Sequence, residues 1–254
     1  MTTSKLWMCA VLSGIAGIFL TTTAAQAQSG VLRVYGGLAP TSYRLALRDS
    51  ISSTTTTATS NYVAANLGMT WVSPRGIYID FSGQKSLSAK HDLWADTGND
   101  SEKFSRDSYT LTGGYIYVLP KGVSVTGFGG YTYGKSTLSA PQGVFPWSKD
   151  FFESNGIFLG VGAGVPALRG QFTGSLAIAG MKGNESDDNG FDIKADTTVG
   201  FSLGGAYTQK LSEAWGITAD VRYQQYKYDF GSEISGYTVT EKITSVGFRL
   251  GYQF

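Results

Sequence analysis

The stretch Thr238–Phe254 ends in a run where large apolar residues alternate with small or polar ones. The apolar set is Val246, Phe248, Leu250, Tyr252 and Phe254. The other set is Ser245, Gly247, Arg249, Gly251 and Gln253. Because successive side chains of a β-strand point to opposite faces, the run predicts a strand with one apolar face and one small or polar face. Such an apolar face must be covered by a protein core or by lipid, and this requirement constrains the fold.

The first 27 residues have the features of a secretory signal peptide. Lys5 supplies a positive charge, and an apolar segment runs from Leu6 to Leu20. Ala25-Gln26-Ala27 provides the small residues that signal peptidase recognises. The apolar segment is short for a membrane span. We therefore expect residues 1–27 to be removed and residues 28–254 to form the mature chain.

The single cysteine, Cys9, lies inside this predicted signal. A mature chain without a thiol has no disulfide, no cysteine nucleophile and no cysteine-bound metal. Removing residues 1–27 takes away one of the 20 basic residues and none of the 19 acidic ones, which leaves a neutral mature chain. A neutral chain lacks the basic surplus of a nucleic-acid-binding protein. We expect no nucleic-acid partner, no metal and no cofactor.

Beyond the signal, no stretch approaches the roughly 18 consecutive apolar residues of a transmembrane helix. A β-barrel satisfies the same sequence, because only every second residue of its strands must be apolar. Ten strand-like runs are expected at 32–47, 62–72, 77–87, 107–119, 123–135, 151–165, 169–181, 193–209, 214–228 and 238–254. In the first run we expect a bulge near Pro40, since proline has no N–H to give to the sheet.

Short and long connections alternate along these ten runs. Short turns on one rim, long loops on the other and an even number of strands are typical of an outer-membrane barrel. The predicted fold is therefore all-β: a transmembrane, antiparallel, up-and-down β-barrel of about ten strands, formed by residues 28–254. Eight or twelve strands are the alternatives for the count. A soluble lipocalin-like barrel, with its apolar residues inside, is the alternative for the class.

The end of the chain resembles the closing strand of bacterial outer-membrane barrels, which finishes in an aromatic residue. The mature chain as a whole looks like the small opacity-type or porin-like outer-membrane barrels of Gram-negative bacteria. This resemblance implies a place in the outer membrane, among lipid and lipopolysaccharide. It also implies handling by periplasmic chaperones and the barrel-assembly machinery. The residues that would carry the assembly signal are Phe248, Leu250, Tyr252 and Phe254.

The inward face of the predicted barrel carries charged residues among many small ones. They are Arg33, Arg44, Asp80, Asp220, Arg222, Glu241 and Arg249. An unpaired charge in a narrow lumen is costly, so these residues are expected to form a salt-bridged plug. A plugged barrel predicts a structural or surface-interaction role, in which long extracellular loops meet an extracellular ligand. The alternative is a narrow porin-like channel for small polar solutes.

Enzymatic activity is the most remote reading. The omptin proteases resemble this chain in strand number and use paired acids with a histidine near the outer rim. The only histidine here is His91, and Ala89 stands where omptins place an aspartate two residues before theirs. An outer-membrane hydrolase that pairs His91 with a serine is the other version, although nothing in the sequence selects the serine. We expect His91 to be a solvated loop residue and the protein not to be an enzyme.

Two acidic segments and one aromatic segment stand out among the loops. Oxygen-rich clusters of this kind can hold Ca²⁺, but neither acidic segment has the spacing of a calcium loop, so a solvated acidic rim is expected. The acidic segments are Asp92, Asp96, Asn99, Asp100 and Glu102, and Asn184, Glu185, Asp187, Asp188 and Asp192. The aromatic segment is 143–147 followed by Phe151 and Phe152. Clustered exposed aromatics mark contact surfaces, and we expect these to pack on the barrel or the membrane.

Overall fold

The computed structural model describes residues 30–51, 53–87, 89–90, 103–139 and 148–254. Ten long antiparallel strands form one sheet, which two short strands extend. The long strands are β1 (Val31–Asp49), β2 (Thr54–Val72), β3 (Ile77–Ser86), β5 (Lys103–Val118), β6 (Ser124–Ser139), β7 (Lys149–Ala167), β8 (Gly170–Asp187), β10 (Thr198–Lys210), β11 (Trp215–Asp229) and β12 (Tyr237–Gln253). The short strands are β4 (Ala89–Lys90), which pairs with β5, and β9 (Asp192–Lys194), which pairs with β8.

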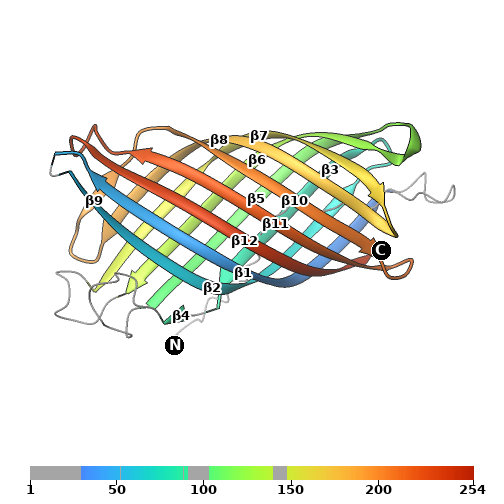
Figure 1. Cartoon of the computed structure of the whole chain (residues 1–254), viewed down its shortest axis with the longest axis horizontal. Helices are drawn as coiled ribbons and strands as arrows, with labels where there is room; N and C mark the ends of the chain where they lie inside the picture. The colour runs from blue at the N-terminus through green and yellow to red at the C-terminus, as the bar shows by residue number, and fades with distance from the viewer. Residues whose placement is uncertain (1–29, 52, 88, 91–102, 140–147) are drawn as a thin grey trace, which may run out of the picture.

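Each long strand pairs with the next long strand, and β1 pairs with β12. The sheet therefore closes on itself, and no long strand keeps a free edge (Figure 1). This confirms the predicted ten-stranded antiparallel barrel. Four strands, β2, β5, β6 and β8, extend well beyond the ends that the sequence indicated, and all four do so toward the same rim. Within the described residues, no helix has the length and apolar character needed to cross a membrane.

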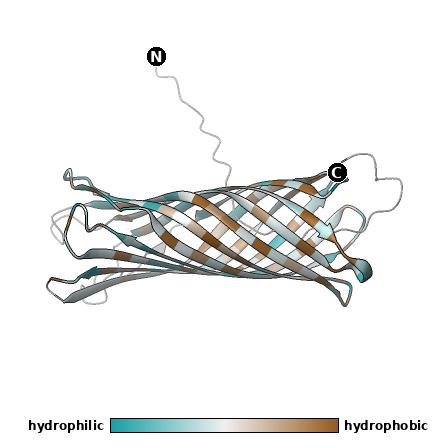
Figure 2. Cartoon of the chain, turned by 90° about the horizontal axis from the view of Figure 1, so that it is seen from above, coloured by the Kyte–Doolittle hydropathy of each residue, from teal (hydrophilic) through white to brown (hydrophobic). Residues whose placement is uncertain are grey.

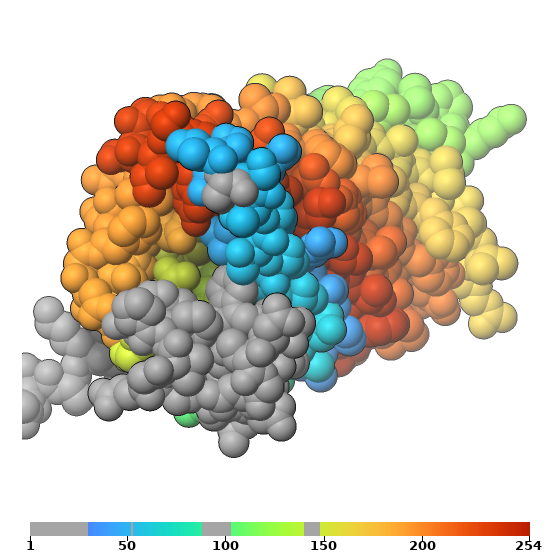
Figure 3. All heavy atoms as spheres, turned by 60° about the vertical axis from the view of Figure 1, so that its left-hand side comes forward, coloured from blue at the N-terminus to red at the C-terminus, as the bar shows by residue number. Residues whose placement is uncertain are grey.

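The two rims of the barrel differ in their connections. One rim carries the short turns 73–76, 119–123, 168–169 and 211–214, together with the ends of β1 and β12. The other rim carries the four-residue connection 50–53 and the longer connections 87–102, 140–148, 188–197 and 230–236. There the 50–53 and 230–236 connections lie side by side, and the N–H of Ser50 donates to the carbonyl of Gly236 at 3.0 Å (Figure 3). Short turns face the periplasm in outer-membrane barrels, and by this rule we call the short-turn rim periplasmic and the opposite rim extracellular.

Apolar residues alternate with polar ones along the strands (Figure 2). The burial of the side chains shows that the apolar set changes face partway along the barrel. On β1, Leu38 points outward and is 51% exposed, while Tyr43 points inward and is 1% exposed. On β11, Val221 points outward and Tyr228 inward. The outward apolar residues form a band around the periplasmic part of the barrel, as contact with lipid requires. Beyond the band, polar residues face outward and apolar residues fill the inside.

We call the strand segments beyond this band the extension. It comprises residues 41–49, 54–62, 84–86, 103–108, 134–139, 149–156, 181–187, 192–194, 224–229 and 237–244. Most of its interior is one apolar cluster: Tyr43, Leu45, Ala58, Tyr62, Phe104, Leu138, Phe152, Met181, Ile193, Tyr226, Tyr228, Phe230, Val239 and Ile243. The extension is thus packed like a small soluble barrel that continues the membrane-spanning one.

The predicted bulge at Pro40 was wrong. The pairing of β1 with β12 has the same register at Leu38 opposite Phe248 and at Thr41 opposite Ser245. The β1–β2 pairing runs through Pro40 without an inserted residue. Only the β1–β12 ladder is interrupted, for Ala39 and Pro40, because proline has no N–H to offer there. The exchange of apolar and polar faces near Pro40 reflects a change of surroundings from lipid to water.

Candidate functional site in the barrel lumen

An ion pair crosses the lumen within the extension. Arg106 on β5 places Nη1 2.7 Å from Oε1 of Glu241 on β12, and the two strands are not neighbours in the sheet. The side chains are 7% and 0% exposed. Arg106 also donates to the hydroxyl of Ser136 at 2.6 Å, and the Tyr228 hydroxyl donates to Glu241 at 3.2 Å. Nη1 and Oε1 of Glu241 form an ion pair, and Oε1 accepts no aligned hydrogen bond.

Aromatic rings pack in the lumen around this ion pair. Tyr43 on β1 packs against Phe104 on β5 with ring centroids 4.9 Å apart, and the Arg106 guanidinium lies 5.1 Å from the centre of the Tyr43 ring. Phe152 on β7 meets Tyr228 on β11 edge to face at 5.0 Å. These rings come from opposite sides of the barrel and are 1% exposed or less. We call this layer, Arg106 with Glu241 and the four rings, the extracellular closure.

A second charged group lies along one wall of the lumen, nearer the periplasm. Arg249 on β12 pairs with Asp220 on β11, with Nη2 2.9 Å from Oδ2, and its guanidinium lies 5.3 Å from the centre of the Tyr35 ring. Asp80 on β3 is 1% exposed. It accepts hydrogen bonds from the hydroxyls of Tyr35 (3.1 Å), Thr70 (2.5 Å) and Ser82 (3.1 Å). These residues come from the five consecutive strands β11, β12, β1, β2 and β3, and we call them the wall group.

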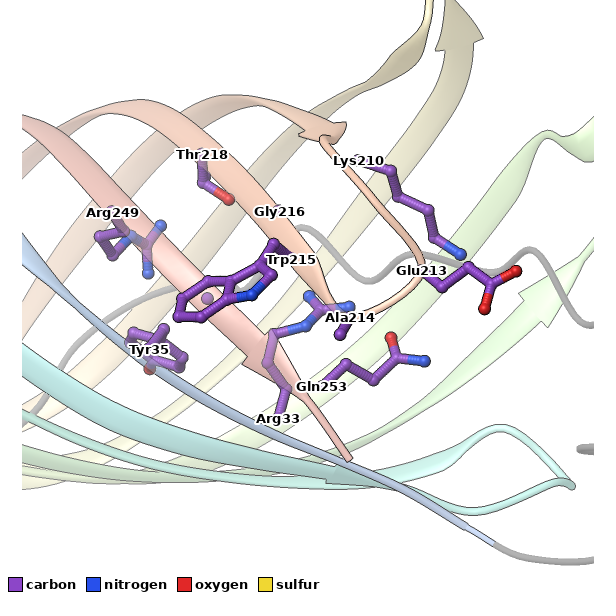
Figure 4. Close-up of a pocket in the computed structure, with 11 residues that line it drawn as sticks. Arg33, Tyr35, Lys210, Glu213, Ala214, Trp215, Gly216, Thr218, Arg249 and Gln253 are labelled. Carbon is purple, nitrogen blue, oxygen red and sulfur yellow. The ribbon is translucent and has the colours of Figure 1, made fainter.

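At the periplasmic mouth, β1, β11, β12 and the 211–214 turn surround a small hollow. Arg33, Lys210 and Glu213 lie at its rim, and Arg249 lies deeper in the barrel (Figure 4). The mouth is thus polar and is connected to the wall group through Arg249.

Six of the seven residues predicted for the lumen face it: Arg33, Asp80, Asp220, Arg222, Glu241 and Arg249. The structure divides them among the mouth, the wall group and the extracellular closure, with Arg222 apart from the two ion pairs. Arg44 does not belong with them, because it is exposed on the outer face of the extension. The prediction assumed a bulge at Pro40, and without that bulge Arg44 keeps the outward direction of Leu38.

Arg106 was missed because residues 88–106 were expected to form a loop. It lies three residues inside β5 and points inward. Both faces of the strand are polar around it, with Ser105, Asp107 and Ser108 as neighbours. The alternation of the strand could have identified it. Arg106 is an even-numbered residue of β5, as are the inward residues Thr110 and Thr112, and even positions of one strand share a face.

A group of acids lies at the loop end of the extension. Burial and the charge of Asp150 raise the pKa of Glu185 to about 7, although the Tyr237 hydroxyl donates to its carboxylate at 3.1 Å. Burial and the nearby Asp187 raise the pKa of Asp150 to about 6. The remaining acids of this segment have other roles: Asp187 accepts the N–H groups of Asn189 (2.8 Å) and Phe191 (2.9 Å), and Asp188 accepts from Ser148. In the described part of the chain, no three metal-ligating side chains gather.

The aromatic segment is divided between the two faces of β7. Phe152 points inward into the extracellular closure, while Phe151 lies on the outer face beneath Lys135, whose Nζ is 4.7 Å from the ring centre. Residues 143–147, His91 and the acidic residues 92–102 lie outside the described residues.

The predicted assembly-signal residues form part of the lipid-facing band at the periplasmic rim. Phe248 and Leu250 are 59% and 47% exposed on the outer face. Tyr252 packs edge to face against Trp215 at 5.0 Å and against Phe254 at 4.8 Å. Aromatic rings at this level suit the boundary between hydrocarbon and headgroups.

No known protein family and no curated protein matches the sequence. The outer membrane protease OmpT from Escherichia coli has a similar structure, with a TM-score of 0.63 at 12% identity over 88% of this chain and 97% of that one. The translocator domain of autotransporter NalP from Neisseria meningitidis gives a TM-score of 0.45 at 13% identity over 88% of each chain. Neisserial surface protein A gives 0.36 at 9% identity over 86% of this chain and 95% of that one.

The likeness to OmpT concerns the fold alone. Together with the closed sheet and the outward apolar band, it confirms the predicted class: this chain is an integral β-barrel protein of the outer membrane.

Proposed function

We propose that this barrel is closed and acts through its extracellular part, in a structural or surface-interaction role. The observation that carries the proposal is the extracellular closure. Its ion pair and rings join strands from opposite sides of the barrel and leave the side chains almost without solvent contact. A lumen closed in this way does not conduct ions. A permeating ion needs water around it, and the buried pair and rings leave no room for that water.

The extension supports a role at the cell surface. A membrane-spanning strand needs about 9–11 residues, whereas β1, β2 and β7 have 19 each. The surplus of about nine residues, at about 3.3 Å each and a tilt of about 40°, raises the loop rim about 20 Å above the apolar band. The packed interior makes this part a firm platform for the long connections. Its partner is then an extracellular ligand held by those connections.

Basic residues on the outer face support contact with lipopolysaccharide. Arg44 and Lys242 are direct cross-strand neighbours just beyond the apolar band, and Lys227 lies on the next strand. Like charges placed opposite one another destabilise a sheet unless an anion lies between them. The phosphate groups of the outer leaflet supply such an anion at this height. The outward aromatic face of β12 supports, through its resemblance to other closing strands, recognition by periplasmic chaperones and the barrel-assembly machinery.

A narrow channel for small polar solutes is the second candidate. Near the periplasm, β8, β10 and β11 present small inward residues to the lumen: Thr173, Ser175, Gly204, Ala206, Thr208 and Thr218. This side leaves space that the wall group does not fill, so the two candidates differ mainly at the extracellular closure. The proposal assigns the protein no catalytic activity, because Ala89 replaces the aspartate that precedes the omptin histidine and nothing in the sequence selects a partner for His91.

Planar-bilayer recording of the refolded mature protein tests the closed barrel. We expect a silent bilayer from protein whose folding is proved by its faster migration in an unheated gel sample. Discrete current steps that change when Arg222 or Arg249 is neutralised would instead establish a pore.

Cysteine labelling on intact cells tests the orientation, because the predicted mature chain has no thiol of its own. Glu233→Cys lies in an exposed position of the 230–236 connection, and Leu168→Cys in a short turn where the native side chain is 92% exposed. A membrane-impermeant maleimide should label Glu233→Cys on intact cells and Leu168→Cys only after the outer membrane is permeabilised. The reverse pattern would contradict the proposed surface role.

A further inference from the structure

A cavity lies in the lumen on the periplasmic side of the extracellular closure. Its lining comes from seven strands, β3, β5, β6, β7, β8, β10 and β11.

The cavity has an apolar side and a polar side. Tyr78, Phe128 and Phe158 form the apolar side, and the last two rings meet edge to face at 6.3 Å. The polar side presents the hydroxyls of Ser175 and Ser202, with Arg222 and Gln224 on β11, while Thr110, Thr112 and Thr132 lie among the rings on β5 and β6. A few convergent polar groups facing an aromatic surface form the usual pattern of a site for a small organic molecule.

Arg222 supplies the only cationic group among the residues that line this cavity. Its nearest acidic partner is Asp220, with which it interacts electrostatically, but the Asp220 carboxylate is already paired with Arg249 at 2.9 Å. No carboxylate of the described residues lies within ion-pair distance of Arg222. Its side chain keeps some accessible surface deep inside the barrel, because it faces the cavity.

The charges below the closure leave a positive surplus. From the mouth to the cavity, the lumen carries Arg33, Lys210, Arg222 and Arg249 against Asp80, Glu213 and Asp220. A buried, incompletely compensated guanidinium is costly, and an anion bound beside it removes that cost.

We propose that the central cavity binds a small organic anion that has a carboxylate and an aromatic or short aliphatic body. The carboxylate lies against Arg222 and the neighbouring hydroxyls, and the body lies against Phe128, Phe158 and Tyr78. The anion reaches the cavity from the periplasm along the small residues of β8, β10 and β11. The neighbouring hollow that shares Ser175 and Arg222 with the cavity lies on this side. The proposal does not depend on the surface role of the extension.

The test uses 4-fluorobenzoate and its neutral counterpart 4-fluorobenzamide, titrated into the folded full-length mature barrel in detergent and followed by ¹⁹F NMR. We expect saturable binding of the acid and at least tenfold weaker binding of the amide, because a charge-assisted hydrogen bond is lost. Arg222→Met should weaken binding of the acid at least tenfold and leave the amide unchanged. Arg44→Met, which removes the same charge from the outer face, should bind both probes as the wild type does.

A second variant keeps the test independent of the folding of Arg222→Met. Ala177 lines the cavity, and Ala177→Leu fills part of it without altering charge. We expect this variant to weaken binding of the acid. Equal affinity of the wild type for acid and amide, or unchanged acid binding in both Arg222→Met and Ala177→Leu, would overturn the proposal. Absence of saturable binding to the folded wild type at millimolar acid would overturn it as well.

Discussion

Replacing Arg106 by methionine should destabilise the barrel strongly, because Glu241 would remain buried without its counter-charge. The Glu241 side chain is 0% exposed, and its remaining protein partner is the Tyr228 hydroxyl at 3.2 Å. Two unit charges about 4 Å apart attract by about 4 kcal/mol at an effective dielectric constant of about 20. Removing one member of such a buried pair costs about 3–5 kcal/mol in measured cases, and we expect a loss of this size.

The double variant Arg106→Met with Glu241→Leu distinguishes the charge from the packing. The surroundings of the pair are largely apolar, with Tyr43 and Phe104 in contact across the lumen. Hydrophobic residues of similar volume often replace a buried pair at little cost, so the double variant should recover most of the lost free energy of unfolding.

The matched control is the pair Lys135–Glu153 on the outer face of the extension. Its atoms are 2.5 Å apart, but the side chains are 39% and 32% exposed. Exposed pairs contribute about 0–1 kcal/mol, so Lys135→Met should change stability by less than that. Urea unfolding of refolded protein in detergent, followed by tryptophan fluorescence, gives all four free energies. An Arg106→Met barrel within 1 kcal/mol of wild type, or a double variant as unstable as the single one, would refute the reasoning.

Three further outcomes are expected. The raised pKa of Glu185, about 7 against an ordinary 4.5, means that folding favours its protonated form, so the stability it contributes is complete below about pH 4.5 and is lost as the pH rises through 7. The shift corresponds to about 3 kcal/mol, and the free energy of unfolding in urea should fall from pH 5 to pH 8 by more in the wild type than in Glu185→Gln. Gly160→Ala should cost about 1–3 kcal/mol in urea unfolding, because the new Cβ would collide with the Phe128 ring, whereas Gly127→Ala meets nothing within 4 Å and should be neutral. Phe254→Ala, at a side chain 70% exposed, should leave unfolding unchanged but lower the yield of folded barrel in cells, and an unchanged yield would argue against an assembly signal there.

The sequence was sufficient to predict the membrane-spanning part of the fold. Lipid contact demands an apolar residue at every second position, and this demand leaves a readable period on β8, β11 and β12. Because short and long connections are segregated to opposite rims, the sequence also predicted which rim faces the periplasm. The same reasoning placed Asp220 and Arg249 on one inward face, and the structure pairs them at 2.9 Å.

Sequence reasoning was weaker beyond the apolar band, for a physical reason. The ends of β5 and β2 in the extension contact water outside and a mixed core inside, so neither face has a uniform polarity. Arg106 was therefore lost among polar neighbours, although it makes the buried ion pair of the extracellular closure. Which strands approach across the lumen depends on closure and shear, and neither can be read from the period of a single strand.

The misplaced bulge at Pro40 and the misplaced Arg44 have one cause. A change of parity in the apolar residues of a strand has two explanations, an inserted residue or a change of solvent. Neighbouring strands distinguish them, because an insertion affects one strand while a solvent boundary affects all strands at the same height. Leu38 and its partner Phe248 both face lipid, and five residues further along β1 Tyr43 and its partner Ile243 both face the interior. Because the switch occurs together on paired strands, it marks the membrane surface. The proposed working surface of the protein begins at that boundary.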